Sequence, residues 1–217
     1  MAQLKLFHFP GGCSRVTMTA LEAAGCDFED EMVNLMKGEH QRPAYRSQNP
    51  RGKIPALLVD GTLLTETAAI LTWIDATFPE AKLFPETSTP LEKAQQLSDL
   101  FWLSSGWHPS VRAMKMPMRW TVGEEAPVRE RGRDLVNPLI DALEARLSEA
   151  AWYYGSTWSI VDVYFYWAYS TAAEGTYDLS DRPHIIRHRA QVEALPAFIR
   201  ARAREDAARL RAKGAEA

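Results

Sequence analysis

A β-hairpin signal that runs directly into a helix signal constrains the fold more than any other stretch of this sequence. In residues 53–66, two short apolar runs are joined by Asp60-Gly61, a strong short-range indication of a two-residue hairpin turn. Apolar residues then recur at helical spacing after Glu66-Thr67. The stretch predicts two antiparallel strands followed at once by a helix.

The residues before this hairpin supply a strand, a helix and a second strand. Residues 4–9 are rich in apolar and aromatic side chains and end in a Pro-Gly-Gly turn, and residues 13–24 carry apolar side chains at helical spacing before a glycine. Residues 28–35 are interpreted as the second strand, and residues 38–52 as a polar loop. The order β-α-β-loop-β-β-α fits a thioredoxin-like α/β domain, which we expect to span residues 1–80.

The second half of the chain contains almost no strand pattern. A proline-rich linker is expected at residues 81–90, followed by an all-α domain over residues 91–217. Residues 159–175 are apolar on most faces, which predicts a buried central helix, and Ser159 with Asp162 forms a capping-box pattern at its start. Five arginines near the C-terminus alternate with acidic residues and alanines, and we interpret them as a solvent-exposed helix face. They are Arg200, Arg202, Arg204, Arg209 and Arg211.

Charge and targeting features exclude several classes of protein. The net charge of -3 and the sequence pI near 6.0 give no electrostatic reason to expect nucleic acid or an anionic membrane as a partner. No run reaches the roughly 20 apolar residues of a membrane-spanning helix, and the N-terminus has no signal-peptide pattern, so a cytoplasmic protein is expected. Cys13 and Cys26 form no CxxC motif and are expected to be reduced. His184 and His188 stand at helical spacing but lack a nearby third ligand, so no metal site is expected.

Three motifs together resemble those of the cytosolic glutathione transferases. Residues 49–70, NPRGKIPALLVDGTLLTETAAI, closely match the glutathione-binding stretch of that family, which runs N-P-x-G-K-(V/I)-P-x-L and continues to L-x-E-(S/T)-x-A-I. Residues 10–14, PGGCS, resemble a turn of the bacterial beta-type enzymes, and residues 155–162, GSTWSIVD, resemble the helix-start motif of their second domain. The resemblance implies a thioredoxin-like domain followed by an all-α domain, with glutathione as co-substrate and a homodimer as the assembly.

The resemblance also implies which residues hold glutathione. The residue before a cis-proline offers its backbone to the cysteinyl part of glutathione in this family, which points to Ile54-Pro55 here. Glu66 and Thr67 lie at a predicted helix start, where free N–H groups and the helix dipole attract the γ-glutamyl carboxylate. Lys53 is a nearby cation for the glycyl carboxylate, as is Arg51.

Two neighbouring residues are candidates for activating the thiol. Cys13 and Ser14 both fall at the predicted N-terminus of the first helix, where the helix dipole favours a thiolate. A donor there would stabilise the glutathione thiolate, whereas Cys13 itself could form a mixed disulfide with glutathione, as the beta-type resemblance implies. His108 sits where beta-type enzymes place an active-site histidine, but it is followed by Pro109, which departs from the usual helical continuation.

A pocket for a hydrophobic electrophile is expected to include Phe9, Trp107, Met114 and Met116. The spacing of the methionines over residues 106–120 is not helical, which favours an irregular segment lining an adaptable apolar pocket; core packing is the competing interpretation. The expected activity is therefore attack of the glutathione thiolate on a small hydrophobic electrophile. Two alternatives stay open: glutathione-dependent disulfide exchange through Cys13, and a non-enzymatic protein that binds apolar ligands.

Overall fold

The computed structural model describes residues 2–214 and divides the chain into two compact units. The first contains the chain up to Leu83 together with the segment from Ala194 onward, and the second runs from Phe84 to Glu193. The boundary between Leu83 and Phe84 falls inside the expected linker. The C-terminal segment differs from the expectation of one helical domain over residues 91–217, because its helix packs with the first unit.

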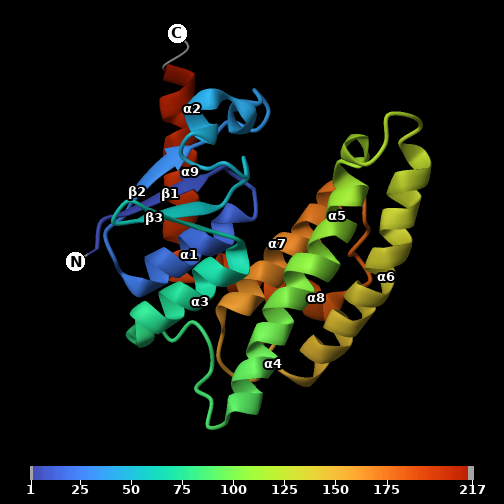
Figure 1. The fold of residues 1–217 in the computed structure, drawn as a ribbon. Coiled ribbons are helices and arrows are strands. Elements are labelled where there is room, and N and C mark those ends of the chain that lie inside the picture. Colours follow the sequence, from blue (N-terminus) through green and yellow to red (C-terminus); the bar gives the residue numbers. More distant parts are fainter. Residues whose placement is uncertain (1, 215–217) are drawn as a thin grey trace. The chain divides into compact units, whose positions relative to one another are not determined.

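The first unit is built on a four-stranded mixed sheet (Figure 1). Its strands are β1 (Leu4–His8), β2 (Glu29–Met32), β3 (Ala56–Val59) and β4 (Thr62–Thr65), in the order β2-β1-β3-β4. β2 runs parallel to β1, and the other neighbours are antiparallel. The predicted hairpin is confirmed: Val59 pairs with Thr62, and both turn residues, Asp60 and Gly61, have positive φ angles as a type I′ turn requires.

Helices cover both faces of this sheet, and the central strand β1 is largely buried, whereas the edge strands β2 and β4 are only partly buried. The helices are α1 (Ser14–Ala24), α2 (Pro43–Arg46), α3 (Thr67–Thr77) and α9 (Pro196–Gly214), and single turns occupy Glu39–Gln41 and Pro79–Ala81. Because side chains alternate along a strand, Phe7 points to the opposite face from Leu6. Phe7 meets Tyr45 of α2 edge-to-face at 5.3 Å, and α1 lies between α3 and α9 (Figure 1). This arrangement confirms the thioredoxin-like fold.

The second unit is all-helical. Its helices are α4 (Pro90–Phe101), α5 (His108–Lys115), α6 (Ala126–Glu149), α7 (Ile160–Glu174) and α8 (Pro183–Glu193), with a short turn at Pro117–Arg119. The predicted central helix is confirmed, since α7 is buried nearly all round. Its capping box is also present: Ser159 N–H donates to Asp162 Oδ2 at 2.8 Å. None of the helices described in residues 2–214 is long and apolar enough to cross a bilayer.

The segment expected to be irregular, 106–120, is mostly helical, and that prediction is wrong. α4 and α5 are joined by a π-helical segment, Trp102–Trp107, in which His108 N–H bonds to the carbonyl of Leu103 five residues earlier. The next residue, Pro109, has no N–H to give to an α-helical ladder. The wider turn therefore occurs where a regular hydrogen bond would be lost in any case.

Candidate active site

The turn between β1 and α1 brings Cys13 to the start of β3. Cys13 is the N-cap residue of α1, is 4% exposed, and its Sγ lies 3.7 Å from the carbonyl oxygen of Ile54. Gly12 permits this approach, because a Cβ there would meet Phe9 O at 3.0 Å and Ile54 Cδ1 at 3.4 Å. Two residues that the sequence assigned to one site, Cys13 and Ile54, are thus side by side in the structure.

Ser14 is used differently from Cys13. Its side chain is fully buried, and its hydroxyl accepts the Phe9 N–H at 3.1 Å and donates to the Phe9 carbonyl at 3.2 Å. Both hydrogen-bonding roles of the hydroxyl are therefore spent on closing the turn. This geometry favours Cys13 over Ser14 as the residue that faces a bound thiol.

The C-terminal helix α9 also contacts the turn between β1 and α1. Glu205 of α9 is 1% exposed; its Oε1 accepts the Gly11 N–H at 3.2 Å, and its Oε2 accepts Arg15 Nε at 3.0 Å and Arg15 Nη2 at 2.5 Å. This contact could not be predicted from the sequence, because Arg15 and Glu205 are 190 residues apart. Cys13 therefore lies in a turn that is anchored on both sides.

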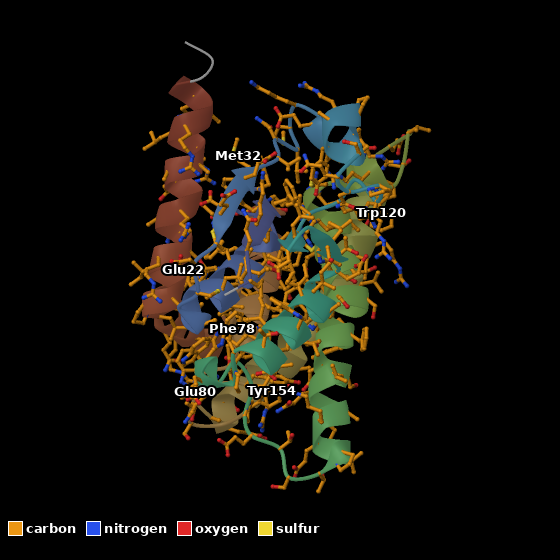
Figure 2. The ribbon with its side chains drawn as sticks, turned by 60° about the vertical axis from the view of Figure 1, so that its left-hand side comes forward. Glu22, Met32, Phe78, Glu80, Trp120 and Tyr154 are labelled. Carbon is orange, nitrogen blue, oxygen red and sulfur yellow. The ribbon has the colours of Figure 1, made fainter. Side chains whose placement is uncertain are left out.

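Four of the five arginines of α9 are exposed as predicted and Arg204 is half-buried, but three of the five also form ion pairs with carboxylates of the first unit. Glu22 of α1, which Figure 2 labels, accepts Arg200 Nε at 2.7 Å and Arg204 Nε at 2.5 Å. Asp30 of β2 accepts Arg204 Nη1 at 3.1 Å and Arg211 Nη2 at 2.6 Å. Helical spacing places these side chains on one face of α9, and they hold it against the first unit.

Asp30 is also adjacent to a buried histidine. His8 Nε2 lies 3.3 Å from Asp30 Oδ2, and this interaction is the largest cause that lowers the pKa of Asp30 to about 2, with smaller contributions from Arg204 and Arg211. The structural role expected for His8 agrees with this position inside the sheet.

The loop before β3 is fixed by a buried asparagine. Asn49 is fully buried, and its Nδ2 donates to the carbonyl of Lys53 at 2.7 Å and to Tyr45 Oη at 3.1 Å. Tyr45 Oη donates to the same Lys53 carbonyl at 2.7 Å. The Ile54-Pro55 bond is cis. The sequence motif contains Asn49, but sequence reasoning assigned it no role; the structure shows that it positions the backbone at Ile54.

The start of α3 presents Glu66 and Thr67 as predicted. Glu66 is the N-cap residue with φ 70° and ψ 121°, a backbone conformation that is rare for a residue other than glycine. Its side chain does not cap the helix; instead Oε1 accepts Arg51 Nη1 at 3.0 Å, with both side chains largely exposed. Thr67 is nearly buried. A simple capping role for Glu66 is therefore excluded, and the first-turn N–H groups have no cap from that side chain.

In the second unit, His108 begins α5 within a polar and aromatic cluster. Its Nδ1 lies 3.4 Å from Tyr164 Oη, Arg112 Nε donates to its Nε2 at 3.5 Å, and its ring stacks obliquely on Trp167 with centroids 4.4 Å apart. Because Nε2 of His108 accepts a hydrogen bond from Arg112, the proton of the neutral imidazole ring is on Nδ1.

The residues expected to line an apolar pocket have different environments. Trp107 and Met114 are fully buried in the core of the second unit, where Trp107 packs edge-to-face on Phe165 at 5.5 Å. Core packing is therefore the better interpretation for these two. Met116 is half-buried and its sulfur accepts Arg112 Nη1 at 3.4 Å, and Phe9, in the first unit, is also half-buried.

The two histidines of α8 have separate carboxylate partners. His184 Nδ1 lies 2.6 Å from Glu144 Oε1, and His188 Nε2 lies 3.0 Å from the buried Asp162 Oδ1. Across residues 2–214, no group of three His, Cys, Asp or Glu side chains is arranged to hold a metal ion.

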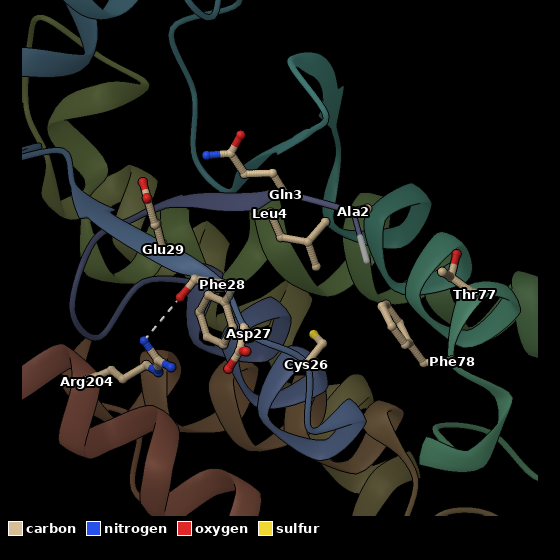
Figure 3. A pocket seen from close by; sticks show the side chains of 10 residues that line it. All are labelled: Ala2, Gln3, Leu4, Cys26, Asp27, Phe28, Glu29, Thr77, Phe78 and Arg204. Carbon is tan, nitrogen blue, oxygen red and sulfur yellow. Dashed lines mark hydrogen bonds between the residues drawn. The ribbon is translucent and has the colours of Figure 1, made fainter.

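A cavity of about 590 Å³ lies in the first unit away from these residues (Figure 3). It is lined by residues from the start of β1, the turn before β2, the end of α3 and α9, and Figure 3 labels all of them. Cys26 contributes its thiol, which donates to the Leu21 carbonyl at 3.5 Å, and burial raises the pKa of that thiol. A protonated thiol is a poor nucleophile, so this cysteine has no place in the candidate chemistry.

Comparison with known families agrees with the two-unit architecture. The family model described as Glutathione S-transferase, N-terminal domain, matches residues 2–76, and the model described as Glutathione S-transferase, C-terminal domain, matches residues 98–196. The chain belongs to the glutathione S-transferase family. The C-terminal family match ends at the start of α9, so the helix that anchors the turn between β1 and α1 lies almost wholly outside it.

Relatives within the glutathione S-transferase family include enzymes of more than one name. Maleylacetoacetate isomerase of Pseudomonas aeruginosa is 30% identical over 184 residues, which is 82% of this chain and 85% of the relative. A sphingomonad glutathione S-transferase solved in complex with glutathione is 29% identical with a TM-score of 0.81, covering 93% of this chain and 98% of the other. A beta class glutathione S-transferase of Sphingomonas chungbukensis gives the same identity, TM-score and coverage. The structural likeness to bacterial beta-class members confirms the resemblance seen in the motifs.

Proposed function

We propose that the first unit binds glutathione, and that the protein uses the bound thiol as a nucleophile towards a small electrophile. The observation that carries the proposal is the position of Cys13 Sγ, 3.7 Å from the carbonyl oxygen of Ile54. The backbone of Ile54 is the edge expected to pair with the cysteinyl part of glutathione. A thiol bound there would lie beside Cys13 at the start of α1.

The two ends of glutathione fit the groups around that edge. The γ-glutamyl carboxylate suits the uncapped first turn of α3 at Thr67, and its ammonium suits the Glu66 carboxylate. Lys53 is an exposed cation available for the glycyl carboxylate. The relative solved with glutathione supports this assignment.

In the proposed reaction, the helix dipole of α1 and a hydrogen bond at Cys13 stabilise the glutathione thiolate. The thiolate sulfur forms a bond to an electrophilic carbon, and the leaving group departs with the electron pair of the bond that breaks. Ser14 is not the donor in this scheme, because its hydroxyl is occupied by the backbone of Phe9.

Calorimetric titration with glutathione tests the binding site. Replacing Glu66 and Thr67 together by Ala should weaken binding by about 2–4 kcal/mol, since charge-assisted hydrogen bonds are lost. The matched control replaces two exposed residues by Ala: Thr77, the last residue of α3, and Glu80, in the short turn that follows it. It should leave binding unchanged. Unchanged affinity in the first variant would refute the site.

A second candidate function is disulfide exchange through Cys13, favoured by the position of its thiol at the start of α1, where the helix dipole stabilises a thiolate. Here Cys13 thiolate attacks a glutathione disulfide, one S–S bond forms as another breaks, and a glutathione thiolate leaves. The purified protein would then carry one glutathione that reductant releases, and Cys13→Ala would abolish both adduct and exchange. Conjugation that survives in Cys13→Ala while exchange is absent in the wild type favours the first function.

The relative named maleylacetoacetate isomerase adds an isomerase to be tested with the same protein. Isomerisation of maleylacetoacetate that requires glutathione would place the chain with that relative. Conjugation of glutathione to aryl halides, with no isomerase activity, would place the chain with the transferases. Tight binding of apolar dyes without turnover of any electrophile would instead support a ligand-binding protein. A homodimer is also proposed from the family, and light scattering coupled to size exclusion measures it.

A further inference from the structure

Two arginines near His108 lack the acidic partners that neighbouring cations have. Lys115 pairs with Glu174, and Arg129 has Glu125 at 3.9 Å. Arg112, on the same helix, lies close to His108, Met116 and Trp167 instead, and no carboxylate of the described residues lies within ion-pair distance of its guanidinium. Its positive charge is therefore balanced by no acidic side chain in its surroundings.

Arg119 is the second arginine; it lies seven residues further along the chain, beyond the end of α5, and its side chain is exposed. It ends the short turn Pro117–Arg119, just before the exposed Trp120 that Figure 2 labels, and no carboxylate within residues 2–214 makes an ion pair with it. Burial lowers the pKa of Arg119, and the positive charge of Arg112 lowers it further. Because Arg119 is exposed, its guanidinium is accessible to a bound anion, which would offset the unfavourable interaction of the two positive charges.

The surroundings of Arg112 hold its guanidinium in place without neutralising it. The guanidinium carbon lies 5.3 Å from the ring centroid of Trp167, which is itself 3% exposed, and the Nε and Nη1 hydrogens point to His108 Nε2 and Met116 Sδ at 3.5 and 3.4 Å. These are weak acceptors at long distances, so a carboxylate would compete with them for the same donors. A fixed, half-buried arginine with weak partners is suited to bind a planar oxyanion.

We infer that Arg112 and Arg119 form a carboxylate-binding site on the second unit, next to His108, and that the second substrate is a small molecule carrying a carboxylate. This narrows the proposed electrophile from any small hydrophobic molecule to one that also carries a carboxylate. The statement that the ligand is a substrate rests on the proposed function. The anion site itself does not, because it is defined by the two arginines.

Binding of a matched pair of probes tests the site without glutathione. Para-nitrobenzoate and para-nitrobenzamide have nearly the same shape and differ in charge. The wild-type protein should bind the benzoate at least about tenfold more tightly, as for a charge-assisted contact, measured by calorimetry or by quenching of tryptophan fluorescence. The preference should shrink at high salt, because salt screens exposed charges.

The variants separate charge from structure. Arg112→Gln with Arg119→Gln should remove the preference for benzoate, and Arg112→Lys with Arg119→Lys should keep part of it. Arg119→Gln alone guards against misfolding, since Arg119 makes no side-chain hydrogen bond to the described residues, and it should lower the preference by about threefold or more. Arg131→Gln, an exposed arginine of α6, is the control and should change nothing.

Turnover then links the site to the reaction. A chlorodinitrobenzoate should lose kcat/KM in the double Gln variant while its methyl ester does not; in both, the glutathione sulfur bonds to carbon and chloride leaves with its electron pair. If neither compound consumes glutathione, the proposed function fails, and the benzoate preference still decides the anion site. Equal affinity of the wild-type protein for the two nitro compounds, or a preference that survives in the double Gln variant, would overturn the inference.

Discussion

Asn49 binds the carbonyl of Lys53 and therefore positions the backbone of the next residue, Ile54. Its amide is fully buried and makes two donor contacts, and its Oδ1 accepts the Arg51 N–H at 3.1 Å. Replacement by Ala leaves the Arg51 N–H without this acceptor and removes one of the two donors to the Lys53 carbonyl, which keeps Tyr45 Oη. Each buried polar group left unsatisfied costs about 1–3 kcal/mol.

We therefore expect Asn49→Ala to lower the free energy of unfolding by about 2–4 kcal/mol and to weaken glutathione binding as well. Urea denaturation and calorimetric titration measure the two effects. Asn137→Ala, which removes an exposed amide that accepts from Tyr177, is the control and should alter neither by more than about 1 kcal/mol. Wild-type stability in Asn49→Ala would contradict the role assigned to this residue.

Asp30 links stability to pH at the residue scale. Because its folded-state pKa is lowered to about 2 from an ordinary value of 3.8, the folded protein gains stability when the carboxylate is ionised. That gain is present in full above pH 4 and is lost as the pH falls from about 4 to about 2. After allowance for screening by water, it is worth about 1–2 kcal/mol.

The measurement is the difference in unfolding free energy between the wild type and Asp30→Asn at several pH values. The gap should be largest at neutral pH and should narrow below pH 4. Asp134→Asn, an exposed carboxylate near Arg131, should give a small gap at every pH. A gap for Asp30→Asn that stays constant down to the acid limit would show that this carboxylate does not titrate with folding.

Residue-level expectations succeeded where the chemistry was local in sequence. The motif over residues 49–70 placed Ile54 at the start of β3 and Glu66 with Thr67 at the start of α3, since a hairpin turn and a helix start leave short-range signals. Glu205 left none, because its meaning depends on Arg15 at the other end of the chain. An arginine-rich helix has the same sequence pattern whether its charges meet water or carboxylates.

At the scale of elements, the same distinction separates α7 from the α4–α5 segment. A helix that is apolar all round has one stable environment, so α7 and its capping box were predicted from the pattern alone. The π-helical segment Trp102–Trp107 was not, because it depends on how the helical ladder adapts to Pro109 rather than on hydrophobic spacing. The methionine spacing was misleading for that reason: Met114 lies in α5, whereas Met116 lies just beyond it.

The contact of α9 with the β1–α1 turn yields a prediction for that element. In Glu205→Gln the partly buried Arg15 cation loses its anionic partner, and the cost should approach the roughly 3–5 kcal/mol typical of breaking a buried ion pair. The amide oxygen of Gln still accepts the Gly11 N–H, so the turn is loosened rather than abolished. We expect faster hydrogen exchange at residues 11–14 and weaker glutathione binding.

Exchange measured by mass spectrometry reads the turn directly. The matched control is Asp206→Asn, the next residue of α9, whose exposed side chain pairs only with Arg209 at 3.2 Å. It should leave exchange at the turn as in the wild type. Equal exchange at residues 11–14 in Glu205→Gln and Asp206→Asn would show that α9 does not position the turn.

At the scale of the whole molecule, the first unit is assembled from both ends of the chain. Residues up to Leu83 form the sheet and its covering helices, and the segment from Ala194 returns after the second unit to pack on α1 and β2. Sequence reasoning placed the boundary near Leu83, because proline-rich composition marks linkers. It could not assign the last helix, since helical periodicity does not say which unit a helix covers.

This topology predicts that, in a chain truncated after residue 193, the first unit unfolds more readily than the second. The truncation exposes the α1 surface that covers the fully buried Phe198, worth about 1.5–3 kcal/mol, and strips Glu22, Asp30 and Arg15 of their partners. Lost together, these contacts are a sizeable share of the stability of a whole domain, about 5–15 kcal/mol. Amides of β1 should then exchange freely while those of α7 stay protected, which makes α7 an internal reference for a folded second unit. Protection of β1 at the wild-type level in the truncated chain would mean that residues up to Leu83 fold without α9.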